Sequence, residues 1–317
     1  MKRLALISLF LIVFVPAAIS PAVADIASGL AAMKKKDYAK ALAAFKPLAE
    51  QGHSKAQYQM GLLYRYGWGV KKNLKQAIKW YTRAAELGHP ISANNVGHMN
   101  RVGLGVKKNY KEAAKWYTRA LDQSPLARNN LSVMHRYGLG VKKSNSEAVR
   151  LLRWAIEDGH GKSMYDLGGL YEKGRGVKKD MAQARKLYLR AAEKKYPRAS
   201  LRLGIMAERG IGIEKKMSTA FNWYKKATEL KYGNAFYFLG NMYLEGHGTE
   251  KNVKEAVRLF NVAARRGDSR GDYILGTLYQ SGKGVTQSNF FARKHYGKAA
   301  KRGHKEAKKK LASMPKK

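Results

Sequence analysis

Small and apolar residues recur at helical spacing along most of the chain, in blocks of two predicted helices. In the block that starts near residue 54, a small residue, Ala56, is followed four positions later by the apolar Met60. A turn with the pattern Gly-x-Gly comes next, at Gly67 and Gly69. The second half of the block has its apolar and small residues at i, i+3, i+4 and i+7, which are Ala77, Trp80, Tyr81 and Ala84. This spacing places them on one face of a helix, so the block predicts two helices joined by a glycine turn.

The same block returns seven times. The first glycine of each turn follows the previous one by 36 residues, with one step of 35, at Gly67, Gly103, Gly138, Gly174, Gly210, Gly246 and Gly282. Regular self-similarity of this length is typical of solenoids, in which each unit buries its apolar face against its neighbours. We therefore predict an all-α solenoid of stacked helix-turn-helix repeats.

Two further positions of the block have a structural interpretation. The second helix opens on a good N-cap residue in six of seven repeats, at Asn73, Asn109, Ser144, Asp180, Asn252 and Ser288, whereas Lys216 takes that position in the fifth. The first helix carries a glycine directly after its apolar residue, as at Gly61, in six repeats, and Ser132 replaces it in the third. Because a helical glycine costs about 1 kcal/mol relative to alanine, we expect a neighbouring helix backbone to approach closely there.

The repeats set the predicted boundaries. We expect a single domain over 25–317, made of a shortened N-terminal pair (25–51), seven repeats (52–302) and a C-terminal capping helix (303–314). Pro47 is expected to bend or shorten the second helix of the opening pair. The third repeat lacks one residue around Gln123-Ser124-Pro125, which predicts a local distortion.

The first 24 residues have the pattern of a secretory signal peptide. Lys2-Arg3 precedes an apolar run from Leu4 to Val15, and Ala22-Val23-Ala24 forms a small-x-small cleavage site. We predict cleavage between Ala24 and Asp25 and a soluble periplasmic or secreted product. No cysteine follows the site, so the pattern does not fit a lipoprotein, and no later stretch is apolar enough to form an integral membrane segment.

Charge and cysteine content narrow the candidate chemistry. The chain has 62 Lys and Arg against 22 Asp and Glu; without the two basic residues of 1–24, 60 remain and the formal net charge is +38. Such a charge attracts acidic partners, although it also serves solubility alone. The absence of cysteine excludes thiol catalysis and thiolate metal sites.

Basic residues gather around the glycine turns. Lysine pairs follow the turns of the first four repeats, at Lys71 and Lys72, Lys107 and Lys108, Lys142 and Lys143, and Lys178 and Lys179. The pairing weakens to Lys215-Lys216 and then to Lys251 alone. Arginines precede the first three turns at one register, at Arg65, Arg101 and Arg136. We predict that these eleven residues bind an anionic partner, with a merely solvated edge as the alternative.

Catalytic and metal-binding patterns are missing from the sequence. It has neither a nucleophile elbow nor an HExxH-type motif, and its histidines are not grouped with carboxylates at ligand spacing. The aromatic residues follow the helical stripe and are expected in the core. We therefore predict no enzyme activity, no small-molecule substrate, no cofactor and no metal.

Residues 52–86 resemble the Sel-1-like repeat, a relative of the tetratricopeptide repeat. The shared pattern is small-x-x-x-apolar-Gly-x-x-Tyr-x-x-Gly-x-Gly-Val followed by Ala-x-x-Trp-Tyr-x-x-Ala-Ala-Glu, and variants fill the rest of the predicted mature chain. The resemblance implies a right-handed superhelix that serves as an adaptor. One exported branch of that family has been linked to β-lactamase activity, but its repeats carry disulfides that this chain lacks, so the activity is not transferred.

The resulting prediction is an exported, monomeric, non-enzymatic scaffold. It is expected to bind an acidic protein partner in the cell envelope or on a host cell. The alternative is direct binding of an anionic polymer or membrane surface (nucleic acid, lipopolysaccharide or an acidic glycan) through the lysine pairs.

Overall fold

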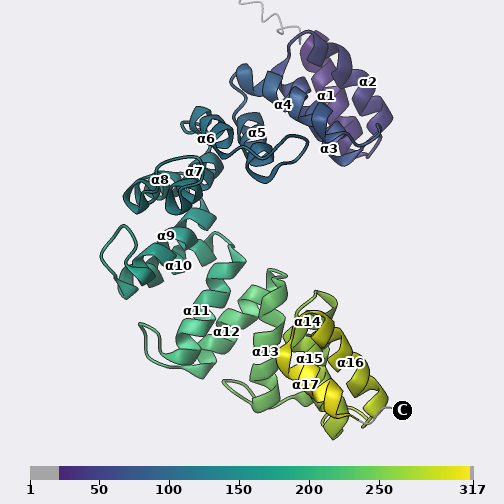
Figure 1. Cartoon of the computed structure of the whole chain (residues 1–317), viewed down its shortest axis with the longest axis vertical. Coiled ribbons are helices and arrows are strands. Elements are labelled where there is room, and N and C mark those ends of the chain that lie inside the picture. Colours follow the sequence, from purple (N-terminus) through teal and green to yellow (C-terminus); the bar gives the residue numbers. More distant parts are fainter. Residues whose placement is uncertain (1–20, 315–317) are drawn as a thin grey trace, which may run out of the picture. The chain divides into compact units, whose positions relative to one another are not determined.

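The computed structural model describes residues 21–314, and every regular element in that range is a helix (Figure 1). The chain divides into two compact units, with the boundary between Ala120 and Leu121. Residues 1–20, which hold most of the predicted signal peptide, lie outside the described residues. The signal peptide and its cleavage between Ala24 and Asp25 therefore stay predictions.

The first unit contains three helix pairs. Its helices are α1 (Pro21–Lys34), α2 (Tyr38–Glu50), α3 (Ser54–Tyr66), α4 (Leu74–Glu86), α5 (Pro90–Val102) and α6 (Tyr110–Arg119). Within this unit each helix packs mainly against the next one along the chain. The first pair is joined by three residues, and the later pairs by the longer glycine turns, as the sequence predicts.

The second unit contains five further pairs and a last helix. Its helices are α7 (Pro125–Tyr137), α8 (Asn145–Glu157), α9 (Gly161–Lys173), α10 (Met181–Glu193), α11 (Pro197–Arg209), α12 (Met217–Glu229), α13 (Gly233–Glu245), α14 (Val253–Arg265), α15 (Ser269–Ser281), α16 (Asn289–Lys301) and α17 (Lys305–Ser313). Here too the main contacts join consecutive helices. We call the first helix of each repeat helix A and the second helix B.

The glycine turns end helix A in the way the pattern requires. Gly67 has φ 75° and its N–H donates to the Leu63 carbonyl, so it closes α3 in the left-handed conformation that glycine adopts without strain. The second glycine of a turn allows close approach, because a Cβ at Gly105 would lie 2.5 Å from the backbone carbonyl carbon of Leu74. Both glycines of the turn are thus needed for backbone reasons.

The predicted N-caps of helix B are confirmed. Asn73 Oδ1 accepts the Gln76 N–H at 3.0 Å, and the other five predicted caps make the equivalent bond. Lys216 precedes α12 without a side-chain cap. A side chain without an acceptor cannot satisfy the free amides of a first helical turn, which is why the exception could be read from the sequence.

The glycine inside helix A lies against the large ring of helix B. A Cβ at Gly97 would lie 2.8 Å from the Tyr117 ring and 3.2 Å from the Ala113 carbonyl oxygen. The expected backbone approach is therefore real, but the aromatic ring is closer. In the third repeat the ring is replaced by Leu152, and Ser132 takes the place of glycine. The smaller partner leaves room for the serine side chain, which is buried.

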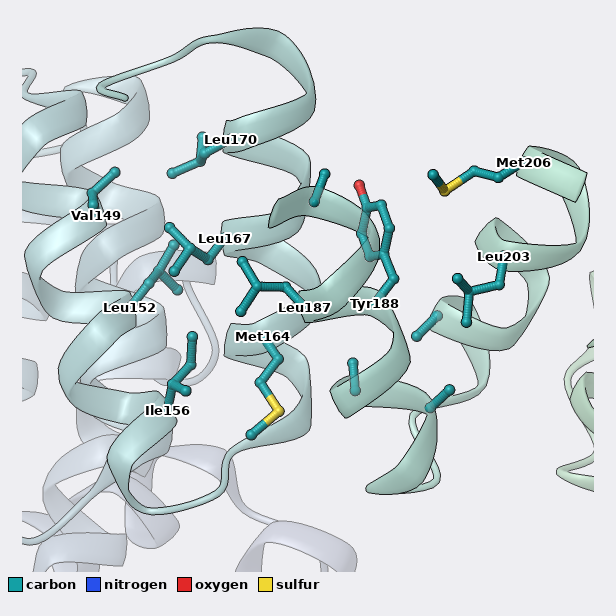
Figure 2. Packing of buried hydrophobic residues seen from close by; sticks show 14 residues of the cluster. Val149, Leu152, Ile156, Met164, Leu167, Leu170, Leu187, Tyr188, Leu203 and Met206 are labelled. Carbon is teal, nitrogen blue, oxygen red and sulfur yellow. The ribbon is translucent and has the colours of Figure 1, made fainter. Parts of the chain in front are cut away.

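The cores are chains of interlocking helix faces rather than one central mass. In the second unit, Leu152 and Ile156 of α8 meet Met164 and Leu167 of α9, as Figure 2 shows. Leu187 and Tyr188 of α10 then lie between α9 and α11, which contributes Leu203 and Met206 (Figure 2). The stripe of aromatic and small residues is therefore core, as predicted.

The segment that lacks one residue has a compensating side chain. Helix α6 has ten residues where the other helices B have 13. In the second unit, buried Arg128 donates to the carbonyl oxygens of Leu121 and Asp122, each at 2.7 Å. Its guanidinium also stacks 4.0 Å from the Trp154 ring centroid and pairs with Asp158. Arg128 thus satisfies carbonyl groups just after the end of α6, where no further helical turn supplies an N–H.

Pro47 departs from expectation. It lies inside α2, which nevertheless extends to Glu50 and has the same 13 residues as α3 and α4. Of the two predicted effects of Pro47, shortening of the helix is therefore wrong, and a bend stays a prediction. Burial of Phe45, Leu48 and Ala49 on both sides of the proline holds the last turn in helical form despite the missing N–H.

Candidate anionic-partner surface

The lysine pairs lie in the connection between helix A and helix B of the first four repeats. All eight lysines are exposed. The second lysine of each pair lies beside the left-handed glycine; a Cβ at Gly67, for example, would lie 3.0 Å from the Cβ of Lys72. The turn therefore fixes the base of this side chain and leaves its ammonium group in solvent.

The pair lysines have no acidic partners. Ten ion pairs join described residues, and none of them includes a pair lysine. Within the described part of the chain, the one aromatic contact of this set is the Lys108 ammonium, which lies 5.7 Å from the Tyr110 ring centroid. Their charges are thus available to an anion from outside.

Lys215 and Lys216 do not form a pair at the positions that the other lysine pairs occupy. Lys215 occupies the second position of a pair, beside Gly210, and Lys216 is the N-cap residue of α12. The first position of the fifth and sixth repeats is acidic, at Glu214 and Glu250. Complete lysine pairs are therefore confined to two repeats of the first unit and two of the second.

Arg65, Arg101 and Arg136 lie in the last turn of α3, α5 and α7, directly before the turn glycines. All three are partly buried. A cation at this end of a helix is favoured by the helix dipole. The arginines thus lie near the lysine pairs in sequence and differ from them in being anchored against their own helices.

Two of these arginines face buried tyrosine hydroxyls. Burial raises the pKa of Tyr81, and the neighbouring Arg65 guanidinium offsets part of that rise. Arg101 has the same relation to Tyr117. Both hydroxyl oxygens are fully buried, and the arginine is the polar group beside each of them. In the third repeat the tyrosine position is Leu152, so Arg136 has no such neighbour.

The fourth and fifth repeats reverse the charge at this register. Glu172 accepts a hydrogen bond from the Tyr188 hydroxyl at 2.8 Å, and Glu208 accepts one from Tyr224 at 2.7 Å. Burial raises the pKa of both tyrosines, and their hydrogen bonds to glutamate add to the rise. Arginine at this register of the sequence therefore ends with Arg136.

Exposed apolar side chains accompany the arginines, and sequence reasoning missed them. Tyr66 is 50% exposed, Val102 39% and Tyr137 60%. They share one register, between the arginine and the first turn glycine. The Tyr66 ring stacks on Trp68 with centroids 4.6 Å apart. The available signal was an apolar residue at a position where the fourth and fifth repeats have Lys173 and Arg209.

Two histidines act as side-chain caps at the start of a helix. His89 Nδ1 accepts the Ser92 N–H at 3.2 Å at the start of α5, and His304 Nδ1 does the same for Ala307 before α17. Residues 21–314 contain no group of three or more histidine or acidic side chains arranged to hold a metal ion. None of the helices in this range combines the length and apolar character needed to cross a bilayer.

Comparison with known proteins places this arrangement in a class of helical repeat proteins. A family model for the Sel1 repeat matches seven consecutive segments, at 54–89, 90–124, 125–160, 161–196, 197–232, 234–268 and 269–304. The chain therefore belongs to the Sel1 repeat family, and the predicted all-α solenoid is confirmed. Proteins of this family are generally scaffolds for protein interaction and typically non-enzymatic.

Two solved structures show the same fold. A protective antigen present in uropathogenic Escherichia coli strains, which displays an SLR fold, is 33% identical over 86% of this chain, with a TM-score of 0.71. This chain spans 58% of that antigen's length. A Sel1 repeat protein from Oxalobacter formigenes is 32% identical over 76% of this chain and 99% of its own, also with a TM-score of 0.71. A comparison with curated proteins finds no match.

Proposed function

We propose that this protein is an exported, monomeric, non-enzymatic scaffold that binds an acidic protein partner. The candidate binding residues are the lysine pairs of the first four repeats and the arginines that precede the first three turns. Each unit carries part of this set, and we call the set the basic surface. The observation that carries the proposal is that all eight pair lysines are exposed without an acidic partner in the described range. Uncompensated cations of this density raise the encounter rate and affinity for an acidic face.

A protein partner is favoured over an anionic polymer by the exposed apolar residues. Tyr66, Val102 and Tyr137 lie one position after the three arginines. Protein interfaces draw much of their binding energy from aromatic and arginine side chains near the centre, with charges around them. A polymer recognised by charge alone has no use for these side chains.

The test compares two variants that each lose six lysines, one at the basic surface and one elsewhere. One variant carries Gln at Lys71, Lys72, Lys107, Lys108, Lys142 and Lys143. The matched control loses six exposed lysines from α16 and α17, which are Lys298, Lys301, Lys305, Lys308, Lys309 and Lys310. Both variants have the same net charge, so only position distinguishes them.

The probe is a fluorescent hexaglutamate peptide, with heparin and duplex DNA in parallel, at low and at moderate salt. We expect the first variant to lose at least about tenfold in peptide affinity and the control to stay near wild type. Equal losses in both variants would reduce the effect to net charge and contradict the proposal. Tighter and more salt-dependent binding of heparin or DNA than of the peptide would favour a polymer ligand instead.

Export has its own test. Expression with the native N-terminus should give a mature protein that begins at Asp25, as determined by N-terminal sequencing, and a monomer in sedimentation equilibrium. A product that keeps Lys2-Arg3 would contradict export, without bearing on the binding surface.

A further inference from the structure

The second unit contains a cavity of about 300 Å³ between helices A of consecutive repeats. Its walls include Arg136 of α7, Gly169, Glu172 and Lys173 of α9, and Arg202 of α11. Tyr188 of α10 also lines it. The cavity therefore lies on the helix A side of the second unit and joins residues far apart in sequence.

One lining residue of the cavity, Gly169, has no side chain. The position after the conserved-register glycine of helix A carries Leu62, His98, Val133, Ile205, Asn241 and Thr277 in the other six repeats. In α9 it is Gly169, although a glycine inside a helix costs about 1 kcal/mol relative to alanine. A Cβ at Gly169 would lie 3.7 Å from the Tyr188 hydroxyl, which is ordinary contact. Packing against neighbours therefore does not demand this glycine, and its effect is to open the space.

The acidic groups around the cavity are already engaged. Glu172 accepts hydrogen bonds from Tyr188 at 2.8 Å and from Arg202 Nε at 3.1 Å, and also pairs with the Arg202 Nη2 group. Asp166, which also lines the cavity, pairs with Lys162 at 2.8 Å. Both carboxylates are thus compensated within the protein.

Two cations at the cavity are not compensated. Arg136 makes no ion pair with any residue from 21 to 314, and its guanidinium lies 5.4 Å from the exposed Tyr137 ring. Lys173 is exposed, and it too takes part in no ion pair of the described chain. In the first two repeats a tyrosine hydroxyl lies beside the equivalent arginine. Leu152 replaces that tyrosine in the third repeat, so Arg136 has no such hydroxyl beside it.

We propose that this cavity binds the carboxylate of a glutamate or aspartate side chain from an acidic peptide segment of the partner. Arg136 is the principal cation and Lys173 the second. The planar guanidinium can hold a carboxylate through two parallel hydrogen bonds, which fixes its position as well as its charge. The inference rests on the proposed function and adds to it one defined subsite within the second unit.

The test uses the fluorescent hexaglutamate peptide, with hexaglutamine as the neutral counterpart, in fluorescence anisotropy. Arg136→Gln removes the cation, and Gly169→Leu fills the cavity with the side chain that α3 carries at the same register. The matched control is Arg190→Gln, which removes an exposed arginine from α10 of the same repeat. We expect Arg136→Gln and Gly169→Leu each to weaken hexaglutamate binding about tenfold or more, and Arg190→Gln to change it less than twofold.

Thermal unfolding of each variant accompanies the binding data. Gly169→Ala serves as a second cavity variant, because its Cβ meets only ordinary contact and its helix propensity is higher. A folded Gly169→Leu protein with unchanged hexaglutamate affinity would overturn the inference. So would equal losses for Arg136→Gln and Arg190→Gln.

The outcome separates this inference from the proposed function. If the six-lysine variant loses the peptide while Arg136→Gln and Gly169→Leu keep it, the subsite is wrong and the basic surface stands. If the cavity variants lose the peptide and the six-lysine variant keeps it, the subsite stands alone.

Discussion

The first two repeats and the fourth and fifth repeats solve the same packing problem with opposite charges. In the first two repeats, which belong to the first unit, the buried hydroxyls of Tyr81 and Tyr117 have an arginine guanidinium as their polar neighbour. In the second unit, Tyr188 and Tyr224 donate hydrogen bonds to glutamates at the same register. The ring packs against a helix A glycine in both cases.

The difference shows that this register does not determine the fold. A glutamate in the last turn of a helix opposes the helix dipole, but Glu172 gains a tyrosine and an arginine as partners. An arginine there suits the dipole, is partly buried and makes no ion pair among the described residues. The fourth and fifth repeats therefore use the position for hydrogen bonds to glutamate, and the first three repeats keep it as part of the basic surface.

The largest expected effect on stability comes from giving the second repeat the serine and leucine of the third repeat in place of Gly97 and Tyr117. Gly97→Ser should lower the free energy of unfolding by about 1–3 kcal/mol, because the added atoms would press on the Tyr117 ring. Tyr117→Leu should also destabilise by opening space in the core. The double variant should lose less than the sum, since Leu152 and Ser132 coexist in the second unit.

The measurement is a double-mutant cycle from urea unfolding followed by circular dichroism. Tyr224→Leu with wild-type Gly204 serves as a single-substitution reference in the second unit. Strictly additive losses would mean that the glycine and the ring are not coupled.

A second prediction addresses the reversed charge directly. Glu172→Gln weakens the acceptor of Tyr188 and removes the ionic partner of Arg202, and should lower the unfolding free energy by about 1–3 kcal/mol. Arg65→Gln should cost less, because the contact of Arg65 with the Tyr81 hydroxyl is weaker than the 2.8 Å hydrogen bond from Tyr188 to Glu172. Thermal and urea unfolding of both variants provide the comparison. A larger loss for Arg65→Gln than for Glu172→Gln would contradict it.

Two partly buried histidines before helices A should make the units differ in acid: His89 caps α5 through its side chain, whereas the His160 ring contacts the Ser163 hydroxyl instead of a backbone N–H. Burial lowers the pKa of His89, and the Lys55 charge lowers it further. His160 in the second unit is also lowered by burial and by Lys162, but Asp166 acts in the opposite direction. A histidine whose folded pKa lies below its unfolded value gives full stability above about pH 6.5, and that stability is lost as the pH falls through the folded pKa.

We therefore expect the melting temperature to fall between neutral pH and about pH 5, and His89→Asn to reduce that fall because asparagine caps without titrating. The melting temperature is measured by differential scanning calorimetry across this pH range. His89→Asn should matter more than His160→Asn. Identical pH profiles for wild type and His89→Asn would show that the His89 cap does not contribute.

The smallest expected effect on stability is at the lysine pairs themselves. Lys71→Gln with Lys72→Gln should change the unfolding free energy by no more than about 0.5 kcal/mol, because neither side chain has a partner to lose in the described structure. Urea unfolding checks this. A clear loss of stability would mean that these lysines support the fold. Neither the proposed binding role nor the solvated-edge alternative requires that.

Much of the fold follows from the sequence because its determinants are local and repeated. Glycine at a left-handed helix end and asparagine at an N-cap act within one turn of chain, so Gly67 and Asn73 could be interpreted by themselves. Pro47 could not, because the contacts of Phe45 and Leu48 decide whether α2 continues past it. Arg128 was equally hidden, since its role depends on Trp154 and Asp158 from a later helix.

The candidate site was predictable only in part. The exposure of the lysine pairs follows from their place in the turns, and the charge reversal at Glu172 is visible in the register. The neighbours of the arginines could not be predicted, because they lie on the next helix. Tyr81 lies beside Arg65, and Leu152 takes the tyrosine position in the repeat of Arg136. The cavity at Gly169 depends on three helices A and could not be seen in any single repeat.

The most direct test of the basic surface is to extend it. Glu214→Lys with Glu250→Lys completes the lysine pairs of the fifth and sixth repeats, and Glu193→Lys with Glu229→Lys makes the same charge change on exposed ends of helices B. Hexaglutamate affinity of the two proteins is measured side by side at the same salt concentration. We predict clearly tighter binding by the first protein than by the second, because position in the turns is what matters. Equal affinities would contradict the account, since net charge alone would then explain the binding.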